Sequence, residues 1–184
     1  MDKKQCIVEY AKKQIPKDLS TLGFSIIKTD DQFKNAYAMH DLAIDYVARQ
    51  YLHGEFGLYP LGVDLRMREV IIENELPDYV VEKGSDLFCF DAKAKSSTNS
   101  FGWVNERAAM SYRKLAKECS VPIYPVFVQV VAKKALGRTA HCNIEDEPIS
   151  KRTAWNGNKV WVFRWKEGLP RLQSTRAANS VVFV

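Results

Sequence analysis

A β-hairpin near the middle of the chain is the feature that most restricts how this sequence can fold. Residues 79–82 and 87–95 are rich in β-branched, aromatic and small side chains, and the polar segment 83–86 separates them. A Gly-Ser pair between two such runs is typical of a tight hairpin turn. We therefore expect two antiparallel strands joined at Gly84 and Ser85.

The register of this hairpin brings two acidic residues together. Counting outwards from the turn, Lys83 opposes Asp86, and Asp78 opposes Asp91. Opposed like charges destabilise a strand pair by up to about 1 kcal/mol, so the two acids need a compensating charge. Hard divalent cations prefer carboxylate oxygens. The pair therefore predicts a site for Mg²⁺ or Mn²⁺.

A lysine accompanies these acids on one face of the second strand. Side chains alternate along a strand, so Asp91, Lys93 and Lys95 share a face with Leu87 and Cys89. A metal beside a lysine is suited to phosphodiester hydrolysis, because the metal polarises the phosphate and helps to generate hydroxide. Lys93 would position the water or stabilise the developing charge.

The remaining pattern predicts a mixed α/β order of elements. Apolar residues recur at helical spacing in three segments and form short β-like runs in others. We expect helices over 2–15, 33–52 and 103–119, strands over 58–67, 69–72, 121–131 and 160–165, and a polar, irregular segment over 132–158. The 184 residues suffice for one core and show neither a repeat nor a Gly/Ser-rich linker, so we expect a single domain.

The acids and the lysine also match a known motif. Pro77-Asp78, a hydrophobic strand and then Phe90-Asp91-Ala92-Lys93 resemble the PD-(D/E)XK nuclease superfamily, which includes restriction endonucleases and archaeal Holliday junction resolvases. The resemblance implies a restriction-endonuclease-like mixed β-sheet flanked by helices. Its core would span roughly 37–131, followed by a C-terminal extension over 132–184.

The resemblance also implies roles for individual residues. Asp78 and Asp91 correspond to the metal ligands, Lys93 to the catalytic lysine, and the backbone carbonyl of Ala92 to a further ligand. Many members place another acid on the helix before the sheet. Here Asp41 and Asp45 lie four residues apart and hence on one helix face, although His40 and Arg49 could simply pair with them.

One departure from the family pattern limits what the resemblance implies. Branches related to exonucleases and helicase-nucleases carry a glutamine four residues before a tyrosine on the following helix. Tyr112 is present here, but the earlier position is Ala108. This argues against that branch and leaves open whether a junction or a short DNA sequence is cut.

The charge balance favours a polyanionic partner. Lys and Arg number 27 against 22 for Asp and Glu, a net charge of +5. Five residues are candidates for contacts with nucleic acid: Lys95, Arg107, Tyr112, Arg113 and Lys114. The alternative for the helix residues among them is an ordinary amphipathic helix with a charged outer face.

Cysteine spacing and hydropathy bear on the compartment. The four cysteines are far apart and form no CxxC pair, so we expect free thiols in a reducing cytoplasm. No run of eighteen apolar residues occurs, and the N-terminus is polar, so we expect neither a membrane span nor a secretion signal.

Together these patterns predict an Mg²⁺- or Mn²⁺-dependent endonuclease that acts on DNA in repair, recombination or restriction. A homodimer would suit cleavage of both strands. Two alternatives stay open: a non-catalytic nucleic-acid-binding or assembly module that retains the nuclease fold, and a protein-interaction domain unrelated to nucleic acid.

Overall fold

The structure is a computed structural model that describes residues 2–14, 31–53, 56–62, 75–132, 134–154 and 157–171, with only the backbone of 31–37 and 136. Three α-helices lie within these ranges: α1 (Lys3–Gln14), α2 (Asp31–His53) and α4 (Glu106–Cys119). The expected helices over 2–15 and 33–52 are confirmed by α1 and α2. The expected strand over 69–72 lies outside the described residues. The second half of the expected strand over 58–67 also lies outside them.

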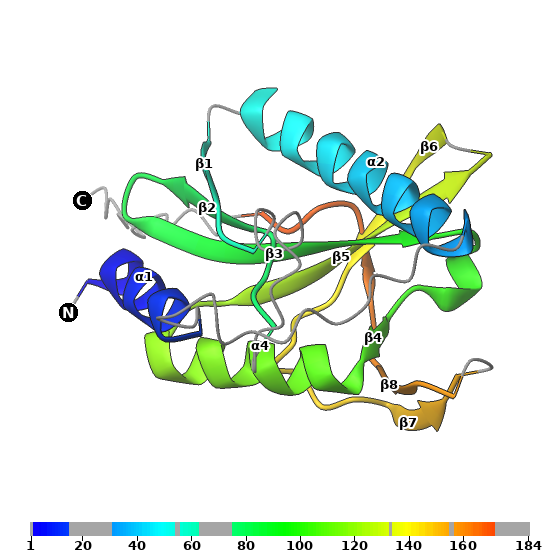
Figure 1. Ribbon diagram of the computed structural model, residues 1–184. Helices are drawn as coiled ribbons and strands as arrows, with labels where there is room; N and C mark the ends of the chain where they lie inside the picture. The colour runs from blue at the N-terminus through cyan, green and yellow to red at the C-terminus, as the bar shows by residue number, and fades with distance from the viewer. Residues whose placement is uncertain are drawn as a thin grey trace, which may run out of the picture.

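A six-stranded sheet forms the centre of the molecule (Figure 1). Its order is β1 (Gly57–Pro60), β2 (Tyr79–Lys83), β3 (Asp86–Lys95), β5 (Ile123–Val131), β6 (Lys134–His141) and β9 (Lys166–Glu167). β3 and β5 run parallel, whereas the other neighbouring pairs are antiparallel. α4 lies in the connection between the two parallel strands, which is the crossover that parallel pairing requires.

The hairpin expected from the sequence is confirmed. Lys83 pairs with Asp86 and Tyr79 with Phe90, so β2 and β3 have the predicted register. Gly84 has a φ of 63°, a left-handed conformation that glycine adopts without a steric penalty. Its place in the turn explains why this hairpin could be read from the sequence.

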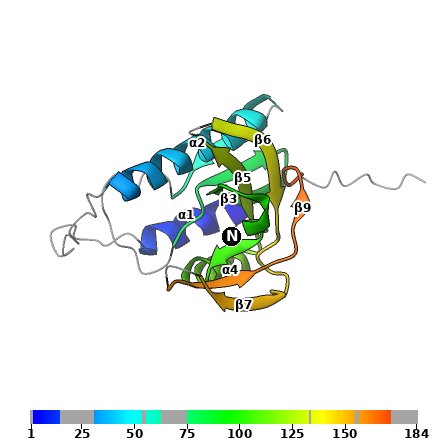
Figure 2. The ribbon, with the colours of Figure 1, turned by 90° about the vertical axis from the view of Figure 1, so that its right-hand side faces the viewer.

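The two faces of the sheet pack against different helices (Figures 1 and 2). Leu87 and Cys89 belong to the core that includes α1 and α4, and Phe88 and Phe90 belong to the core beneath α2. This is the alternation that the sequence predicted for β3. Asp91 lies on the α4 side, where it contacts that helix.

A second, three-stranded sheet extends the fold beyond the sequence prediction. It has the order β4 (Trp103–Asn105), β8 (Lys159–Val162) and β7 (Ser150–Thr153). A 3-10 turn, η2 (Thr98–Ser100), connects β3 to β4. The prediction that 132–158 is irregular was wrong, because β6 and β7 lie within it. These strands pair with their neighbours through backbone hydrogen bonds and carry mostly polar side chains, so hydrophobic alternation does not reveal them.

Helix α4 corresponds to the predicted helix over 103–119 but begins at Glu106. The predicted strands over 121–131 and 160–165 correspond to β5 and β8, and each is shorter in the structure than predicted. The first three residues of the predicted helix, 103–105, form strand β4 instead, because they pair with β8. The described part of the chain is thus a mixed α/β domain whose main sheet is largely antiparallel and flanked by helices.

The cysteine prediction was wrong for two of the four residues. Cys6 of α1 and Cys119 of α4 form a disulfide across 113 positions of sequence, and Cys89 and Cys142 are free and buried. The pairing depends on α1 packing beside α4, which the spacing of the cysteines does not indicate. Within the described ranges, no helix has both the length and the apolarity to span a membrane.

Candidate functional site

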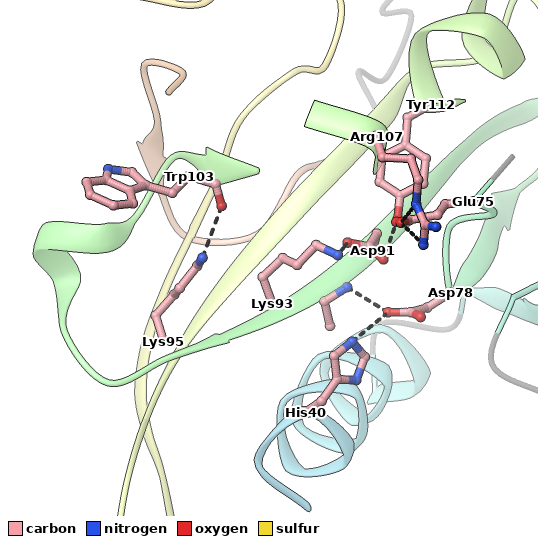
Figure 3. A network of polar contacts seen from close by, with 10 residues as sticks. His40, Glu75, Asp78, Asp91, Lys93, Lys95, Trp103, Arg107 and Tyr112 are labelled. Atoms are coloured by element: carbon pink, nitrogen blue, oxygen red, sulfur yellow. Dashed lines mark hydrogen bonds and ion pairs between the residues drawn. The ribbon is translucent and has the colours of Figure 1, made fainter. Parts of the chain in front are cut away.

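Three residues predicted to carry chemistry lie together where β2 begins and β3 approaches its end (Figure 3). Asp78 immediately precedes β2, and Asp91 and Lys93 lie on β3. Asp78 and Asp91 are only 1% and 3% exposed. Because a charged carboxylate is costly to bury, each must be stabilised by nearby donors or cations.

Asp91 is held from two sides. Its Oδ1 accepts a hydrogen bond from the hydroxyl of Tyr112 at 2.8 Å, and its Oδ2 lies 2.7 Å from Nζ of Lys93. Oδ2 is buried, and its close partner among the described residues is the Lys93 ammonium. An oxygen of this kind can accept a further cation without breaking an existing hydrogen bond.

Asp78 is tied to the backbone of β3. Its Oδ2 accepts the N–H of Ala92 at 2.8 Å and lies 4.0 Å from Nε2 of His40 on α2. Figure 3 shows His40 approaching the carboxylate of Asp78 from α2. Asp78 therefore links the edge of β2, the backbone of β3 and helix α2.

The carbonyl of Ala92 points to the same side of β3 as Asp78. Backbone N–H and C=O groups alternate in direction along a strand. The N–H of Cys89 bonds to Pro122 on the β5 side, whereas that of Ala92 bonds to Asp78 on the opposite side. Extending the β2–β3 register puts Pro77 opposite Ala92, and proline has no N–H to offer that carbonyl. The geometry suits the predicted ligand role of this oxygen.

Lys93 remains a cation despite its position. Burial lowers the pKa of Lys93, but the charges of Asp91, Asp78 and Glu75 outweigh that effect and leave the pKa above its ordinary value. Its side chain is 21% exposed, and its Nζ lies 2.7 Å from Oδ2 of Asp91. A lysine with a raised pKa can stabilise negative charge but is poorly suited to act as a general base.

Lys95 lies in a different environment from Lys93. Burial, followed by repulsion from Lys93, lowers the pKa of Lys95 to about 8. Its Nζ donates to the carbonyl of Trp103 at 3.0 Å. Lys95 therefore braces the segment that follows β3, and the prediction that it contacts nucleic acid gains no support from this position.

Two site residues were not found from the sequence. Glu75 acts electrostatically on Lys93 and Tyr112, and Arg107 binds its carboxylate at 2.7 Å. His40 approaches Asp78 from α2. The sequence offers a weak signal for Glu75, which lies three positions before Asp78, but its contact with Arg107 spans 32 positions.

The acids predicted on α2 are not brought into this cluster. Asp41 is exposed, and Asp45 is 56% exposed and forms an ion pair with Arg49 at 2.8 Å. A helix presents only one face to the sheet, and here His40 lies towards that face, with Ala43 and Val47, whereas Asp41 and Asp45 do not. The alternative that Arg49 simply pairs with an acid is confirmed for Asp45.

Most of the residues predicted to contact nucleic acid serve other purposes. Tyr112 is 1% exposed, so it cannot stack on a base, and that prediction was wrong. Arg113 donates to the carbonyls of Ile144 and Asp146. Arg107 pairs with Glu75, whereas Lys114 lies exposed on α4.

The donor set can be compared with the needs of Mg²⁺ or Mn²⁺. Asp91 Oδ2, the carboxylate of Asp78 and the carbonyl of Ala92 are all oxygen donors, as hard cations require. In the ranges that the structure describes, no group of three or more His, Cys, Asp or Glu side chains is arranged to hold a metal. Two carboxylates and a backbone carbonyl would nevertheless suit a metal whose other positions are taken by water and phosphate.

Comparisons with known proteins do not assign this site. No protein-family model and no curated protein matches the chain in sequence. The chemistry of the cluster is therefore the basis for a functional proposal.

Proposed function

We propose that the protein is a metal-dependent endonuclease that hydrolyses phosphodiester bonds in DNA. The observation that carries the proposal is the triad of two buried carboxylates, Asp78 and Asp91, and the partly buried ammonium of Lys93, which interact at the open end of a hairpin. A purely structural ion pair would need only one of the two acids.

The fold supports the proposal in its order of elements. Along the described chain, helix α2 precedes the antiparallel strands β1, β2 and β3, and the short strand β4 and helix α4 lead to β5, which runs parallel to β3. The PD-(D/E)XK resemblance implies a core of helix, three or four strands, helix and strand, with which this order is compatible. Asp78 immediately precedes β2, and Asp91 and Lys93 lie on β3, which is compatible with the positions that the resemblance implies. This agreement concerns architecture, and function depends on the site itself.

The proposed function assigns a separate role to each residue of the site. Asp78, Asp91 and the carbonyl of Ala92 would hold Mg²⁺ or Mn²⁺, which when bound polarises a phosphate and lowers the pKa of a coordinated water. Lys93, kept protonated by the surrounding acids, would stabilise the negative charge that develops on the phosphate. Tyr112 would orient Asp91 through its hydroxyl group.

DNA is the proposed substrate because of charge as well as chemistry. The chain carries a net charge of +5, and its exposed lysines and arginines would neutralise backbone phosphates. Binding should therefore weaken steeply as salt is added. A homodimer would allow both strands of a duplex to be cut. We propose a homodimer only for the case in which the protein cleaves duplex DNA.

One observation favours a second candidate, a non-catalytic nucleic-acid-binding module with a nuclease-like fold. The described part of the chain supplies only two acids close to Lys93 whose oxygens are buried, and no third side chain completes a metal-holding group. Such a module would bind DNA without cutting it.

The test is a cleavage assay on the full chain with labelled linear duplex, flap, four-way junction, single strand and RNA, in Mg²⁺ or Mn²⁺. Wild type should cut a DNA substrate, and chelator, Asp91→Ala and Lys93→Ala should each abolish cutting. Lys13→Ala, which removes an exposed charge from α1, should cut normally. If wild type binds DNA but cuts nothing, the binding module is correct and the endonuclease proposal fails.

A further inference from the structure

An open hollow of about 520 Å³ lies beside the three-stranded sheet. Its walls come from the segment after β3, from β7 and from the residues that follow β8. Aromatic and basic side chains dominate the lining, which includes Phe101, Trp103, Trp165, Arg152 and Arg164, and none of the described residues that line the hollow is acidic. The hollow has the size of a small-ligand pocket and a positive character.

Trp165 offers an aromatic surface at this hollow. Its side chain is 41% exposed, although its ring packs edge-on against Phe101, with 5.6 Å between the ring centroids. Phe101 in turn stacks on Phe127 of β5 at 5.9 Å. The indole is therefore braced by the core on one side and open to solvent on the other.

Gly102 allows the two walls of the hollow to approach each other. It has a φ of +82°, and a Cβ at this position would lie 2.3 Å from the carbonyl oxygen of Phe163. The N–H of Phe163 donates to the carbonyl of Gly102 at 3.0 Å. Any larger residue would push apart the segments that carry Trp103 and Trp165.

Positive charge continues beyond the hollow along the β7–β8 hairpin. A second hollow of about 280 Å³ shares Arg152 and is also lined by Lys151 and Lys159. Glu106 is the acidic residue among the described residues that line this second hollow, and its carboxylate accepts a hydrogen bond from Nε1 of Trp161 at 2.9 Å. The exposed cations that line the two hollows are Lys151, Arg152, Lys159 and Arg164, and we call them the β7–β8 basic surface. Because side chains alternate along a strand, Lys151 and Arg152 point to opposite faces of β7, so this surface wraps around the edge of the three-stranded sheet.

The hollow is connected to the candidate site through one strand. Lys95 lies two residues after Lys93 on the same face of β3, and its Nζ donates to the carbonyl of Trp103 at 3.0 Å. Figure 3 shows Lys95 and Trp103 to one side of Lys93, with Asp91 and Asp78 to the other. A polymer held at Lys93 could continue past Lys95 into the hollow.

From these features we infer that the hollow and the β7–β8 basic surface bind a single-stranded stretch of DNA next to the cleavage site, an inference that rests on the proposed function. Exposed indole and guanidinium groups stack on bases, and neighbouring lysines neutralise phosphates. The bases of a duplex are stacked on each other and cannot offer their faces to Trp165. The substrate class is therefore DNA with an unpaired segment.

The test measures binding by fluorescence anisotropy in chelator, so that cleavage plays no part. The probes are labelled oligo-dT, a blunt duplex and oligo-rU, and the proteins are wild type, Trp165→Ala, Trp165→Phe and Arg164→Gln. Lys13→Gln, on α1 at the other end of the molecule from β7 and β8 in Figure 1, is the matched loss of one exposed charge. Circular dichroism establishes that each variant is folded.

Oligo-dT should bind more tightly than blunt duplex. Trp165→Ala should weaken oligo-dT binding roughly 5- to 100-fold, as expected for the loss of one stacked base, and Trp165→Phe should restore most of it. Arg164→Gln should also weaken binding and make it less dependent on salt, whereas Lys13→Gln should not weaken it.

The inference is overturned if Trp165→Ala binds oligo-dT as wild type does, if blunt duplex binds equally well, if oligo-rU is preferred, or if no probe binds. Failure of the proposed function looks different. In that case no substrate is cut in Mn²⁺, while the effect of Trp165→Ala on oligo-dT binding is retained.

Discussion

The hydroxyl group of Tyr112 donates a 2.8 Å hydrogen bond to Oδ1 of Asp91, which joins helix α4 to the middle of the candidate site. Burial, together with the charges of Asp91, Asp78 and Glu75, raises the pKa of Tyr112 well above its ordinary value. The hydroxyl therefore keeps its proton and stays a donor. Asp91 is oriented by a helix as well as by the lysine on its own strand.

Tyr112→Phe should remove this orientation. A buried carboxylate oxygen that loses its donor costs about 1–3 kcal/mol in the free energy of unfolding. If the proposed function is correct, cleavage should fall roughly 10- to 100-fold, as it does when residues that orient metal ligands are lost. Urea denaturation and the rate of DNA cleavage measure the two effects.

Tyr124→Phe is the control, because it removes a hydroxyl from β5 next to the core beneath α2. It should leave the cleavage rate unchanged. Equal rates for wild type and Tyr112→Phe would show that the hydrogen bond does not orient Asp91 for catalysis.

The ion pair between Asp91 and Lys93 should give a measurable coupling free energy between mutations of these two residues. Asp91→Asn leaves the Lys93 ammonium without its closest counter-charge and should lower the free energy of unfolding by about 1–3 kcal/mol, a range reduced because Lys93 reaches solvent. Adding Lys93→Met should restore part of this loss. A double-mutant cycle in urea measures the coupling, and strict additivity of the two changes would argue against the pair.

Lys95 should make stability depend on pH. Its folded-state pKa of about 8 lies below its ordinary value of 10.5, so between these values the unfolded chain binds the extra proton. The Lys95 contribution to stability should therefore rise as pH increases through this window, by up to about 3 kcal/mol. Below pH 8 both states are protonated, and the penalty of burying the charge is fully present.

The measurement is the difference in unfolding free energy between wild type and Lys95→Met at several pH values. Taking the difference removes the titration of all other groups that the two proteins share. The difference should be constant below about pH 8 and shift in favour of wild type above it. A difference that is flat up to pH 10 would contradict the lowered pKa.

The disulfide between Cys6 and Cys119 should stabilise the fold by joining α1 to α4. Because it closes a loop of 113 positions, Cys6→Ser should lower the free energy of unfolding by about 2–4 kcal/mol. Thermal unfolding with and without reductant tests this. Reductant should destabilise wild type and have no effect on Cys6→Ser, and an equal response of both proteins would exclude the bond as the cause.

The site was predicted from the sequence as far as local patterns reach. Strand alternation and the turn at Gly84 determine which residues of β3 share a face, and the hairpin register brings Asp78 towards Asp91. These relations span at most 14 positions, so side-chain periodicity is enough to reveal them.

Contacts between distant elements could not be predicted in the same way. The choice of His40 rather than Asp41 or Asp45 depends on how α2 is rotated over the sheet, and the pairing of Glu75 with Arg107 depends on the approach of α4. A rotation of one residue changes which side chain faces inward, and sequence spacing does not specify it.

The sequence by itself determined helices α1 and α2, the β2–β3 hairpin and which residues of β3 share a face, because backbone geometry imposes a period on side chains within a strand or helix. Only the tertiary structure decided which groups surround Asp91 and Asp78, that Cys6 meets Cys119, and that polar strands build a basic hollow around Trp165. Those outcomes arise from packing between elements far apart in the chain, where the fit of whole surfaces, and no local pattern, sets the contacts.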